Sequence, residues 1–350
     1  MSRSWSKCCS SLTVEAPPQL AAPVHATLFT GPFRHLALVQ PRVGIGDMIW
    51  HLPHLRALAR GPGRVTLVAR PRSMADQFVG AQDGIDDIFW IERDQWLPEG
   101  RHQGVAGLAR LVAELRARRF DAAVLMTRSR VLSFAVAAAG VRRRQGYGIG
   151  SQRWLLNRPP FLPETARKHH PYEQATAWLE AGGLALDEPE PRLAVLPAAR
   201  AAARARLGVA GRFAALGIAT SDAWKQWGGP NFSVLARRLR DAGWTIALVG
   251  GPAERAVAEA IAGPAVPVLG WNLRDVAAVL AEADFYVGND TAALNIAAAV
   301  GTRAYGLFGA TPVLHHSPNI IPIVPPGGLD KDSGMERITV AAVLDAIKPR

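Results

Sequence analysis

The segment Val287-Gly288-Asn289-Asp290-Thr291-Ala292 runs directly into Ala293-Leu294-Asn295-Ile296-Ala297-Ala298-Ala299-Val300-Gly301. The residues before it, Asp284 to Val287, predict a strand that ends at Gly288, and the small residues after it predict a helix that closes at Gly301. Asp290 or Thr291 is well placed to cap that helix. A helix N-terminus at the carboxyl end of a strand presents free N–H groups and a positive dipole end to an anion. The segment therefore predicts a phosphate or diphosphate site, and the alternative is an ordinary capped helix.

The same order, a short apolar strand followed by a helix, recurs along both halves of the chain. Strands are expected at residues 36–39, 65–69, 87–91, 120–126, 213–218, 244–249, 266–269 and 305–309. Helices are expected at 47–60, 73–79, 104–118, 133–140, 172–181, 232–242, 273–281 and 339–348, and residues 142–162 are expected to form a loop. This alternation predicts an α/β fold of two Rossmann-like, doubly wound parallel sheets that face each other across a cleft.

The length of 350 residues and the hydrophobic content of 49% allow two domains with large cores. The Pro-rich run Asp187-Glu188-Pro189-Glu190-Pro191 is the expected linker. We therefore expect an N-terminal domain over residues 34–188 and a C-terminal domain over residues 189–350. Residues 1–33 show neither helical nor strand periodicity and are expected to form a disordered extension. They are not expected to be a signal peptide, because prolines interrupt the apolar run that a signal peptide needs.

The composition is strongly basic, with a formal net charge of +11 and a sequence pI near 10.5. Such a charge favours acidic partners, among them phosphorylated lipids, sugar phosphates and nucleic acid. No stretch is long and apolar enough to span a bilayer, so contact with a membrane is expected to be peripheral. Cys8 and Cys9, adjacent and alone, can form neither a disulfide framework nor a metal knuckle, which suits a reducing compartment.

Gly44-Ile45-Gly46-Asp47 follows the first expected strand and opens the first helix. Its glycines allow a tight turn and leave room for a ligand. Asp47 would face the cleft, either as a first-turn helix carboxylate or as a general base that takes a proton from an attacking hydroxyl. Ile49 stands where a dinucleotide-binding fingerprint needs Gly or Ala, and no P-loop with Gly-Lys-Ser or Gly-Lys-Thr occurs, so an oxidoreductase is weakly supported.

Polar residues follow the strands of the second half as well. Thr220, Ser221 and Lys225 come after the first of them, where two hydroxyls and an ammonium can bind a diphosphate, although Lys225 could equally be a solvated lysine. Gly250, Gly251 and Glu254 come after the next strand. These glycines permit close approach, and Glu254 is read either as a ribose contact or as the first-turn acid of a helix.

Further clusters carry weaker signals. The histidine pairs at 169–170 and 315–316 lack metal-ligand spacing to carboxylates or cysteines, so no metal site is predicted. A basic group in the first half is read either as solvated charge or as a contact for an anionic acceptor: Arg128, Arg130, Arg142, Arg143 and Arg144. The basic residues lack interleaved aromatics and no nucleic-acid module is present, which argues against nucleic acid as the partner.

Together these segments resemble glycosyltransferase family 9, the lipopolysaccharide heptosyltransferases with a GT-B fold. The resemblance covers most of the chain from about Leu36 onward and rests on five motifs in the family's order. They are Arg42-Val43-Gly44-Ile45-Gly46-Asp47 with Pro53, Lys225-Gln226-Trp227, Gly288-Asn289-Asp290-Thr291-Ala292 through Ala299, Phe308-Gly309-Ala310-Thr311-Pro312, and Met335-Glu336-Arg337-Ile338-Thr339-Val340.

The resemblance implies an inverting transferase without a metal or other cofactor, and ADP-heptose as the expected donor. By position, Asp47 becomes the catalytic base. The implied diphosphate contacts are Thr220, Ser221, Lys225, Asp290, Thr291 and Ala292; the nucleoside contacts are Gly250, Gly251 and Glu254; the acceptor-side residues are Gly46, Arg128, Arg130 and Arg144. The implied acceptor is a phosphorylated glycolipid of the lipopolysaccharide core, reached from the cytoplasm by peripheral contact with the anionic inner membrane.

Two positions depart from the family pattern. Asn295 stands where the family usually has His, and Ala292 stands where it usually has Gly. Asn keeps its hydrogen-bonding capacity but carries no charge. The alternatives that stay open are a family member with another nucleotide sugar or a protein acceptor, and an inactive paralogue that binds nucleotide sugar.

Overall fold

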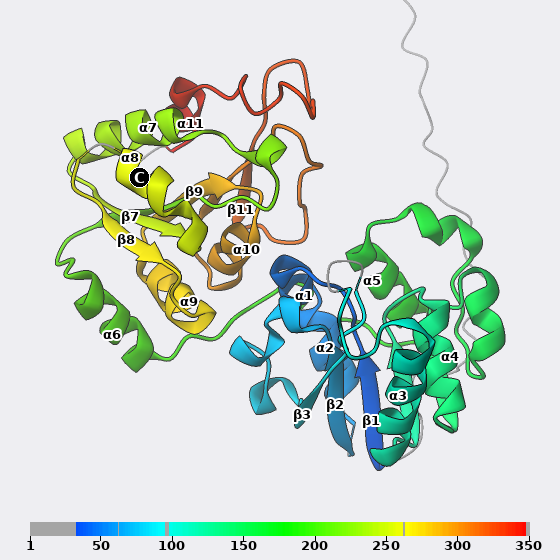
Figure 1. Ribbon diagram of the computed structural model, residues 1–350. Helices are drawn as coiled ribbons and strands as arrows, with labels where there is room; N and C mark the ends of the chain where they lie inside the picture. The colour runs from blue at the N-terminus through cyan, green and yellow to red at the C-terminus, as the bar shows by residue number, and fades with distance from the viewer. Residues whose placement is uncertain (1–32, 62, 95–97, 262, 348–350) are drawn as a thin grey trace, which may run out of the picture.

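The computed structural model of the protein describes residues 33–61, 63–94, 98–261 and 263–347. Two parallel sheets, each covered by helices, form two globular halves that meet at α1 and α10 (Figure 1). The predicted α/β class with two parallel, doubly wound sheets is therefore confirmed. The extension predicted over residues 1–33 lies outside the described residues except for Phe33.

The first sheet has five strands in the order β3-β2-β1-β4-β5, all paired in parallel. The strands are β1 His35–Val39, β2 Arg64–Ala69, β3 Asp87–Trp90, β4 Ala122–Leu125 and β5 Arg143–Gly146. The helices are α1 Ile45–Trp50, α2 Leu52–Ala59, α3 Gly104–Ala117, α4 Arg130–Ala138 and α5 Pro171–Ala181. The short 3-10 helices are η1 Pro71–Ser73, η2 Ala75–Gln77, η3 Ala81–Asp83, η4 Gly150–Leu155 and η5 Glu164–Lys168.

The second sheet has six parallel strands in the order β11-β10-β9-β6-β7-β8. The strands are β6 Phe213–Gly217, β7 Thr245–Gly250, β8 Val266–Leu269, β9 Phe285–Asn289, β10 Ala304–Leu307 and β11 Ile320–Ile323. The helices are α6 Pro197–Leu207, α7 Gly229–Asp241, α8 Arg255–Ala260, α9 Leu273–Glu282, α10 Ala292–Ala299 and α11 Val340–Ala346, with the 3-10 helices η6 Ala223–Lys225 and η7 Pro252–Glu254.

Both sheets are buried on their two faces, which explains the continuous apolar runs in their central strands. Leu36 and Leu38 of β1 contribute to a core that continues into the second half of the chain through α10. Ala37 and Val39 point to the opposite face and join a separate core under α3 and α4. The first core therefore links the two sheets, so the contact between the two halves of the chain includes apolar side chains.

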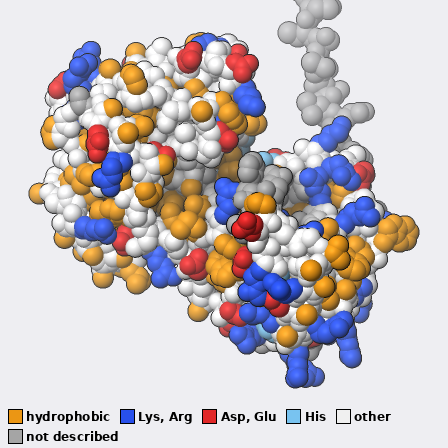
Figure 2. All heavy atoms as spheres, viewed as in Figure 1, with side chains coloured by type: hydrophobic (Ala, Val, Ile, Leu, Met, Phe, Trp, Pro, Cys, Tyr) orange, Lys and Arg blue, Asp and Glu red, His pale blue; other side chains and the backbone are white. Residues whose placement is uncertain are grey.

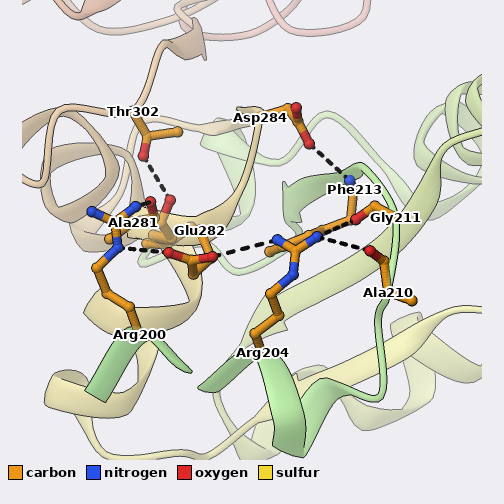
Figure 3. Close-up of polar contacts among 10 residues, drawn as sticks. Arg200, Arg204, Ala210, Gly211, Phe213, Ala281, Glu282, Asp284 and Thr302 are labelled. Atoms are coloured by element: carbon orange, nitrogen blue, oxygen red, sulfur yellow. Dashed lines mark hydrogen bonds and ion pairs between the residues drawn. The ribbon is translucent and has the colours of Figure 1, made fainter. Parts of the chain in front are cut away.

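Helix α6, which the sequence analysis did not predict, attaches the chain to the second sheet. The carboxylate of Glu282 at the end of α9 accepts bonds from Arg200 Nε at 2.6 Å and Arg204 Nη1 at 3.4 Å (Figure 3). Arg204 Nη2 also donates to the carbonyl of Gly211. The predicted boundary at residues 188/189 lies between α5 and α6 and stays a prediction.

A row of glycines crosses the middle of the second sheet. Gly288 of β9 pairs with Gly217 of β6 on one side and with Gly306 of β10 on the other. A Cβ at Gly217 or Gly288 would collide with the hydroxyl of the fully buried Tyr286. The prediction that the strand ends at Gly288 is wrong, because β9 pairs through this glycine row to Asn289.

Other differences from the sequence expectation have local causes. The helix expected at 47–60 is divided at His51, since Pro53 occupies the start of α2 and cannot donate to the preceding turn. The helix expected at 73–79 consists of 3-10 turns separated by Met74, whose φ is 50°. The loop expected at 142–162 contains β5, whose Arg-Arg-Gln-Gly sequence has no strand pattern and forms an edge strand by pairing with β4.

Candidate functional site

The N-terminal ends of α1 and α10 lie against each other between the two sheets (Figure 1). Each helix follows an inner strand, β1 or β9, so both begin at the carboxyl edge of their sheets. The approach is close at Gly46, where an added Cβ would lie 2.9 Å from Asn295 Nδ2. Figure 2 shows an open notch between the two halves. The fold therefore brings Asp47 and the Asp290–Ala292 turn to one place.

Asn295 connects the two halves through both ends of its amide. Its Oδ1 accepts a hydrogen bond from the indole Nε1 of Trp50 in α1. Its Nδ2 donates to the carbonyl of Thr291 at 3.0 Å, within the first turn of α10. Because Asn295 is only 4% exposed, both bonds are shielded from water. The side chain that departs from the family pattern thus ties α1 to α10.

Asp47 lies in the first turn of α1 with its side chain 19% exposed. Oδ1 pairs with Arg42 Nε at 2.6 Å, and Oδ2 lies where a Cβ on Gly44 would be 2.6 Å away. No side-chain cap bond is present at the start of α1. The carboxylate is therefore held by one cation over a glycine turn and stays accessible to a ligand.

Gln40 is a buried residue that the sequence analysis did not single out. Its Oε1 accepts from the backbone N–H of Arg42 at 2.8 Å, and its Nε2 lies 3.3 Å from His51 Nδ1. The His51 ring also contacts the Asp47 carbonyl, 2.6 Å from Nδ1. Gln40 therefore fixes the loop that presents Arg42 and Asp47. Its only sequence signal was a polar side chain directly after an aliphatic strand.

The loop that carries Lys225 is held by Asn289 at the end of β9. Asn289 Nδ2 donates to the Ala219 carbonyl at 3.0 Å and to Gln226 Oε1 at 2.9 Å, and Asn289 Oδ1 accepts from Trp227 N at 3.1 Å. Asn289 is fully buried. This side chain therefore determines where the loop runs and so places Lys225 beside Asp290.

Lys225 itself is largely enclosed, with its side chain 19% exposed. Its Nζ lies 3.7 Å from Asp222 Oδ2 and 5.1 Å from the centre of the Trp224 ring. Lys331, from the segment before α11, lies 5.1 Å from the same ring. The two ammonium groups on one tryptophan concentrate positive charge here. Lys331 was not predicted as a site residue because it is remote in sequence and lies outside every motif.

The hydroxyls of Thr220 and Ser221 bond within their own turn. Thr220 Oγ1 donates to the Asp222 carbonyl at 2.7 Å, and Ser221 Oγ donates to Asp222 Oδ2 at 2.8 Å. Ser221 is exposed, and Thr220 is half-buried. Both hydroxyls belong to the same short loop as Lys225 and would need to rotate to meet a ligand.

At the start of α10, Asp290 is a mostly buried carboxylate. Burial raises the pKa of Asp290, while a hydrogen bond from Thr311 and the charge of Lys225 act in the opposite direction. Thr291 occupies the N-cap position of α10 but its side chain makes no cap bond. Ala292 is the first helical residue. The free N–H groups of this turn remain available for an anion.

Glu254 uses its carboxylate in its own turn. Oε2 accepts from the backbone N–H of Gly251 at 2.7 Å, which is the first-turn role considered from the sequence. Gly250 packs closely, since a Cβ there would lie 3.2 Å from Leu269 Cδ2. Gly250 is the last residue of β7, and Gly251 and Glu254 follow it, two strands from β9 in the same sheet.

The arginines expected on the acceptor side do not form one cluster. Arg128 and Arg130 follow the carboxyl end of β4 and are exposed. Arg144 lies in β5, the edge strand that pairs with β4. Its Nε donates to the Leu155 carbonyl at 2.9 Å, and its Nη1 donates to the Val141 carbonyl at 2.7 Å. The structure therefore leaves Arg144 apart from Asp47 and gives it a role in holding the chain after β5.

Aromatic and histidine rings close one side of the contact between α1 and α10. His316, from the loop after β10, lies 4.9 Å from Trp50 and 5.5 Å from Tyr172, measured between ring centroids. His170 lies 5.0 Å from Trp50, again between ring centroids. Burial and the neighbouring His170 lower the pKa of His316 to about 3, and burial lowers the pKa of His51 to about 4. The interface is therefore built with neutral imidazoles.

Within the described residues, no group of three or more His, Cys, Asp or Glu could hold a metal ion. The same part of the chain has no helix that is both long and apolar enough to cross a membrane.

Acidification is predicted to weaken the folded state through these histidines. In the unfolded chain their pKa is near 6.5, so the unfolded state binds more protons below that value. The free energy of unfolding is therefore constant above about pH 6.5 and falls as the pH drops toward about 4. Urea titrations of His316→Gln should show a difference between pH 7 and 5 smaller by about 1 kcal/mol than in the wild type, after allowance for solvent screening.

Lys168→Gln, at an exposed lysine of η5, is the control and should keep the wild-type slope. An unchanged slope in His316→Gln would exclude His316 as a source of the pH dependence.

A second prediction concerns the bond between Trp50 and Asn295. Trp50→Phe keeps a ring but removes the N–H donor, and Asn295→Ala removes the acceptor. A double-mutant cycle in urea should give a coupling energy of about 1 kcal/mol, because each single change leaves the same bond unmade. Trp50→Phe combined with Glu282→Ala, at the C-terminal end of α9 where the carboxylate pairs with α6, should be additive. Additivity in the first pair would contradict the proposed bond.

Comparison with known proteins places this geometry in a family. The family model for glycosyltransferase family 9 (heptosyltransferase) matches residues 108–320, more than half of the chain. The comparison with curated proteins gives no match.

Three solved structures show the same fold over nearly the whole chain. A glycosyltransferase family 9 protein from Veillonella parvula DSM 2008 has 16% identity and a TM-score of 0.72, covering 93% of this chain and 97% of that one. E. coli ADP-heptose LPS heptosyltransferase II has 18% identity, coverage of 89% and 96%, and a TM-score of 0.69. E. coli heptosyltransferase WaaC with ADP-2-deoxy-2-fluoro heptose has 19% identity, coverage of 89% and 98%, and a TM-score of 0.67.

These matches confirm the predicted GT-B fold, in which two Rossmann-like domains face each other. The family model leads to a single assignment: the chain belongs to glycosyltransferase family 9 and is a glycosyltransferase.

Proposed function

We propose that the enzyme transfers heptose from ADP-heptose to a phosphorylated glycolipid acceptor of the lipopolysaccharide core type, with inversion at the anomeric carbon. The observation that carries the proposal is the contact between α1 and α10, which brings Asp47 to the same place as Lys225, Asp290 and the free N–H groups of α10. Solved relatives contain ADP or ADP-2-deoxy-2-fluoro heptose, which supports an ADP-sugar donor.

In the proposed reaction, an acceptor hydroxyl attacks the anomeric carbon of the donor from the side of Asp47. The bond between that carbon and the diphosphate oxygen breaks, and the electron pair leaves with ADP. Asp47 takes the hydroxyl proton as the new glycosidic bond forms. Lys225 and the N–H groups at Thr291 and Ala292 stabilise the charge that develops on the departing diphosphate.

Arg42 has a positioning role in this scheme. Its guanidinium holds one oxygen of Asp47, so that the other oxygen above Gly44 is left for the acceptor proton. Thr220, Ser221 and Asp290 complete the proposed diphosphate side, and Gly250, Gly251 and Glu254 the nucleoside side. Gly46, Arg128 and Arg130 remain the proposed acceptor-side residues.

Nucleotide binding is the first test. Calorimetric titration of ADP, GDP and UDP should show preferential binding of ADP, and Lys225→Ala should weaken that binding about tenfold, because one charge-assisted contact to the diphosphate is lost. Lys168→Ala, at an exposed lysine of η5, serves as the control and should bind like the wild type. Preference for GDP or UDP would discard the ADP-heptose donor, and absence of binding would favour the inactive-paralogue alternative.

Asp47→Asn tests the general base separately from binding. The amide keeps the shape of the carboxylate and one acceptor oxygen for Arg42 but cannot take the proton, so the turnover number should fall by at least about a hundredfold. ADP affinity should stay within about twofold, since Asp47 belongs to the first domain and the proposed diphosphate contacts belong to the second. Asp241→Asn on α7 is the surface control. Full turnover in Asp47→Asn would refute the assignment of Asp47 as the base.

A further inference from the structure

One continuous part of the first half is basic without any acidic residue. Between Asp121 and Glu164 the sequence contains no Asp or Glu. The same stretch contains seven arginines: Arg128, Arg130, Arg142, Arg143, Arg144, Arg153 and Arg158. This segment, which includes α4, β5 and η4, therefore carries only positive charges, and the arginines exposed on α4 and η4 are Arg130 and Arg153.

Large apolar side chains are exposed within this basic surface. Trp154 of η4 is 87% exposed, and Phe134 and Val131 of α4 are 48% and 37% exposed. Figure 2 shows orange and blue side chains together along the right-hand edge of the first domain. Isolated exposed apolar residues need no explanation, but a tryptophan, a phenylalanine and a valine on adjoining elements form a patch.

The two elements are fixed to each other, so the patch is a defined surface. Gln152 of η4 is fully buried and donates to Ser133 Oγ at 3.0 Å and to the Thr127 carbonyl at 2.7 Å. Gly148 N in turn donates to Gln152 Oε1 at 3.0 Å. The residues next to these contacts, Phe134 on α4 and Trp154 on η4, project outward from the joined elements.

Helix α4 has a buried face and an unpartnered face. Leu132, Ala135 and Val136 belong to the core under the first sheet. Arg130, Val131 and Phe134 lie on the other side and are exposed. Arg153 lies between the two apolar groups in sequence and stacks over Phe161, with 4.9 Å from Cζ to the ring centroid. We define the α4–η4 face as Arg130, Val131, Phe134, Arg153 and Trp154.

We propose that the α4–η4 face docks onto the surface of an anionic phospholipid bilayer. Trp154 and Phe134 would enter the boundary between headgroups and acyl chains, where aromatic rings are favoured. Arg130 and Arg153 would pair with lipid phosphates, and the face itself contains no Asp or Glu that the negative leaflet would repel. A bilayer fits this surface because it supplies both an apolar layer and a plane of negative charge.

The position of the α4–η4 face agrees with the proposed function. The purpose of docking rests on that proposed function. Helix α4 begins at the carboxyl edge of the first sheet, the edge at which α1 with Asp47 also begins. Docking there would bring the acceptor side of the notch to the membrane, where a glycolipid acceptor is embedded. Docking itself depends only on the residues of the face.

Sedimentation with lipid vesicles tests the proposal on the full chain. One set of vesicles is phosphatidylcholine alone, and the other contains about 30 mol% phosphatidylglycerol to supply negative charge. The wild type should sediment with the anionic vesicles and far less with the neutral ones. Phe134→Ser with Trp154→Ser should weaken partitioning at least about tenfold, and Arg130→Gln with Arg153→Gln about twentyfold, since each arginine near a leaflet contributes about fivefold.

Arg237→Gln with Arg238→Gln on α7 of the second domain is the matched charge control and should partition like the wild type. Circular dichroism and ADP titration of every variant show whether it is folded and whether the donor side is intact. The proposal is overturned if the serine variant binds anionic vesicles as the wild type does, or if the α7 control loses as much binding. Equal binding to a soluble polyanion such as heparin by wild type and serine variant, without vesicle binding, would instead indicate an acidic macromolecule as the partner.

The vesicle and ADP measurements test the docking face and the proposed function separately. Vesicle binding with no ADP binding would keep the docking face and discard the heptosyl donor. ADP binding with no vesicle binding would keep the donor site and remove the docking face.

Discussion

The contact between α1 and α10 is the constraint on which the site depends, and Asn295 is its centre. Each sheet alone offers only half of the proposed transferase site, because the proposed base and the proposed diphosphate contacts come from different domains. The amide of Asn295 is satisfied at both ends, by Trp50 in one domain and by Thr291 in its own. A buried amide with one end unmade would cost about 1–3 kcal/mol, so separation of the helices is resisted. The distance between Asp47 and α10 is thereby kept short.

The second domain shows why its sequence motifs occur together. Asn289 bonds to the backbone N–H of Trp227, and the indole of Trp227 donates to the Ile338 carbonyl at 2.7 Å. Met335 Sδ accepts from Gly309 N at 3.2 Å. Residues that stand far apart in the chain therefore form one set of contacts around the end of β9. Asn289 and Trp227 therefore support the loop that carries Lys225, which gives them a structural role whether or not they touch a ligand.

The sequence was sufficient for the fold class because parallel strands buried on both faces leave continuous apolar runs, as in β1 and β6. It also placed Asp47 and the Asp290–Ala292 turn at strand ends, where open α/β sheets bind ligands. It failed where tertiary pairing decides the structure. Edge strand β5 has no apolar period, and α1 and α2 are separated by the effect of Pro53. Pairs such as Trp50 with Asn295 are 245 positions apart, and no local pattern reports them.

The arginines show the same limit of prediction from sequence. Net charge alone cannot separate arginines that hold the chain together from those that face a partner. Arg274 donates to the carbonyls of Asp76 and Gln77 at 2.7 and 2.8 Å, and Arg337 donates to the Gly328 carbonyl at 2.9 Å. Such guanidinium groups hold one part of the chain to another, although each of them counts fully toward the formal net charge of +11. The surroundings of an arginine therefore distinguish the two cases. The α4–η4 face combines Arg130 and Arg153 with the exposed rings of Phe134 and Trp154 and contains no Asp or Glu, so its chemistry is complementary to an anionic membrane.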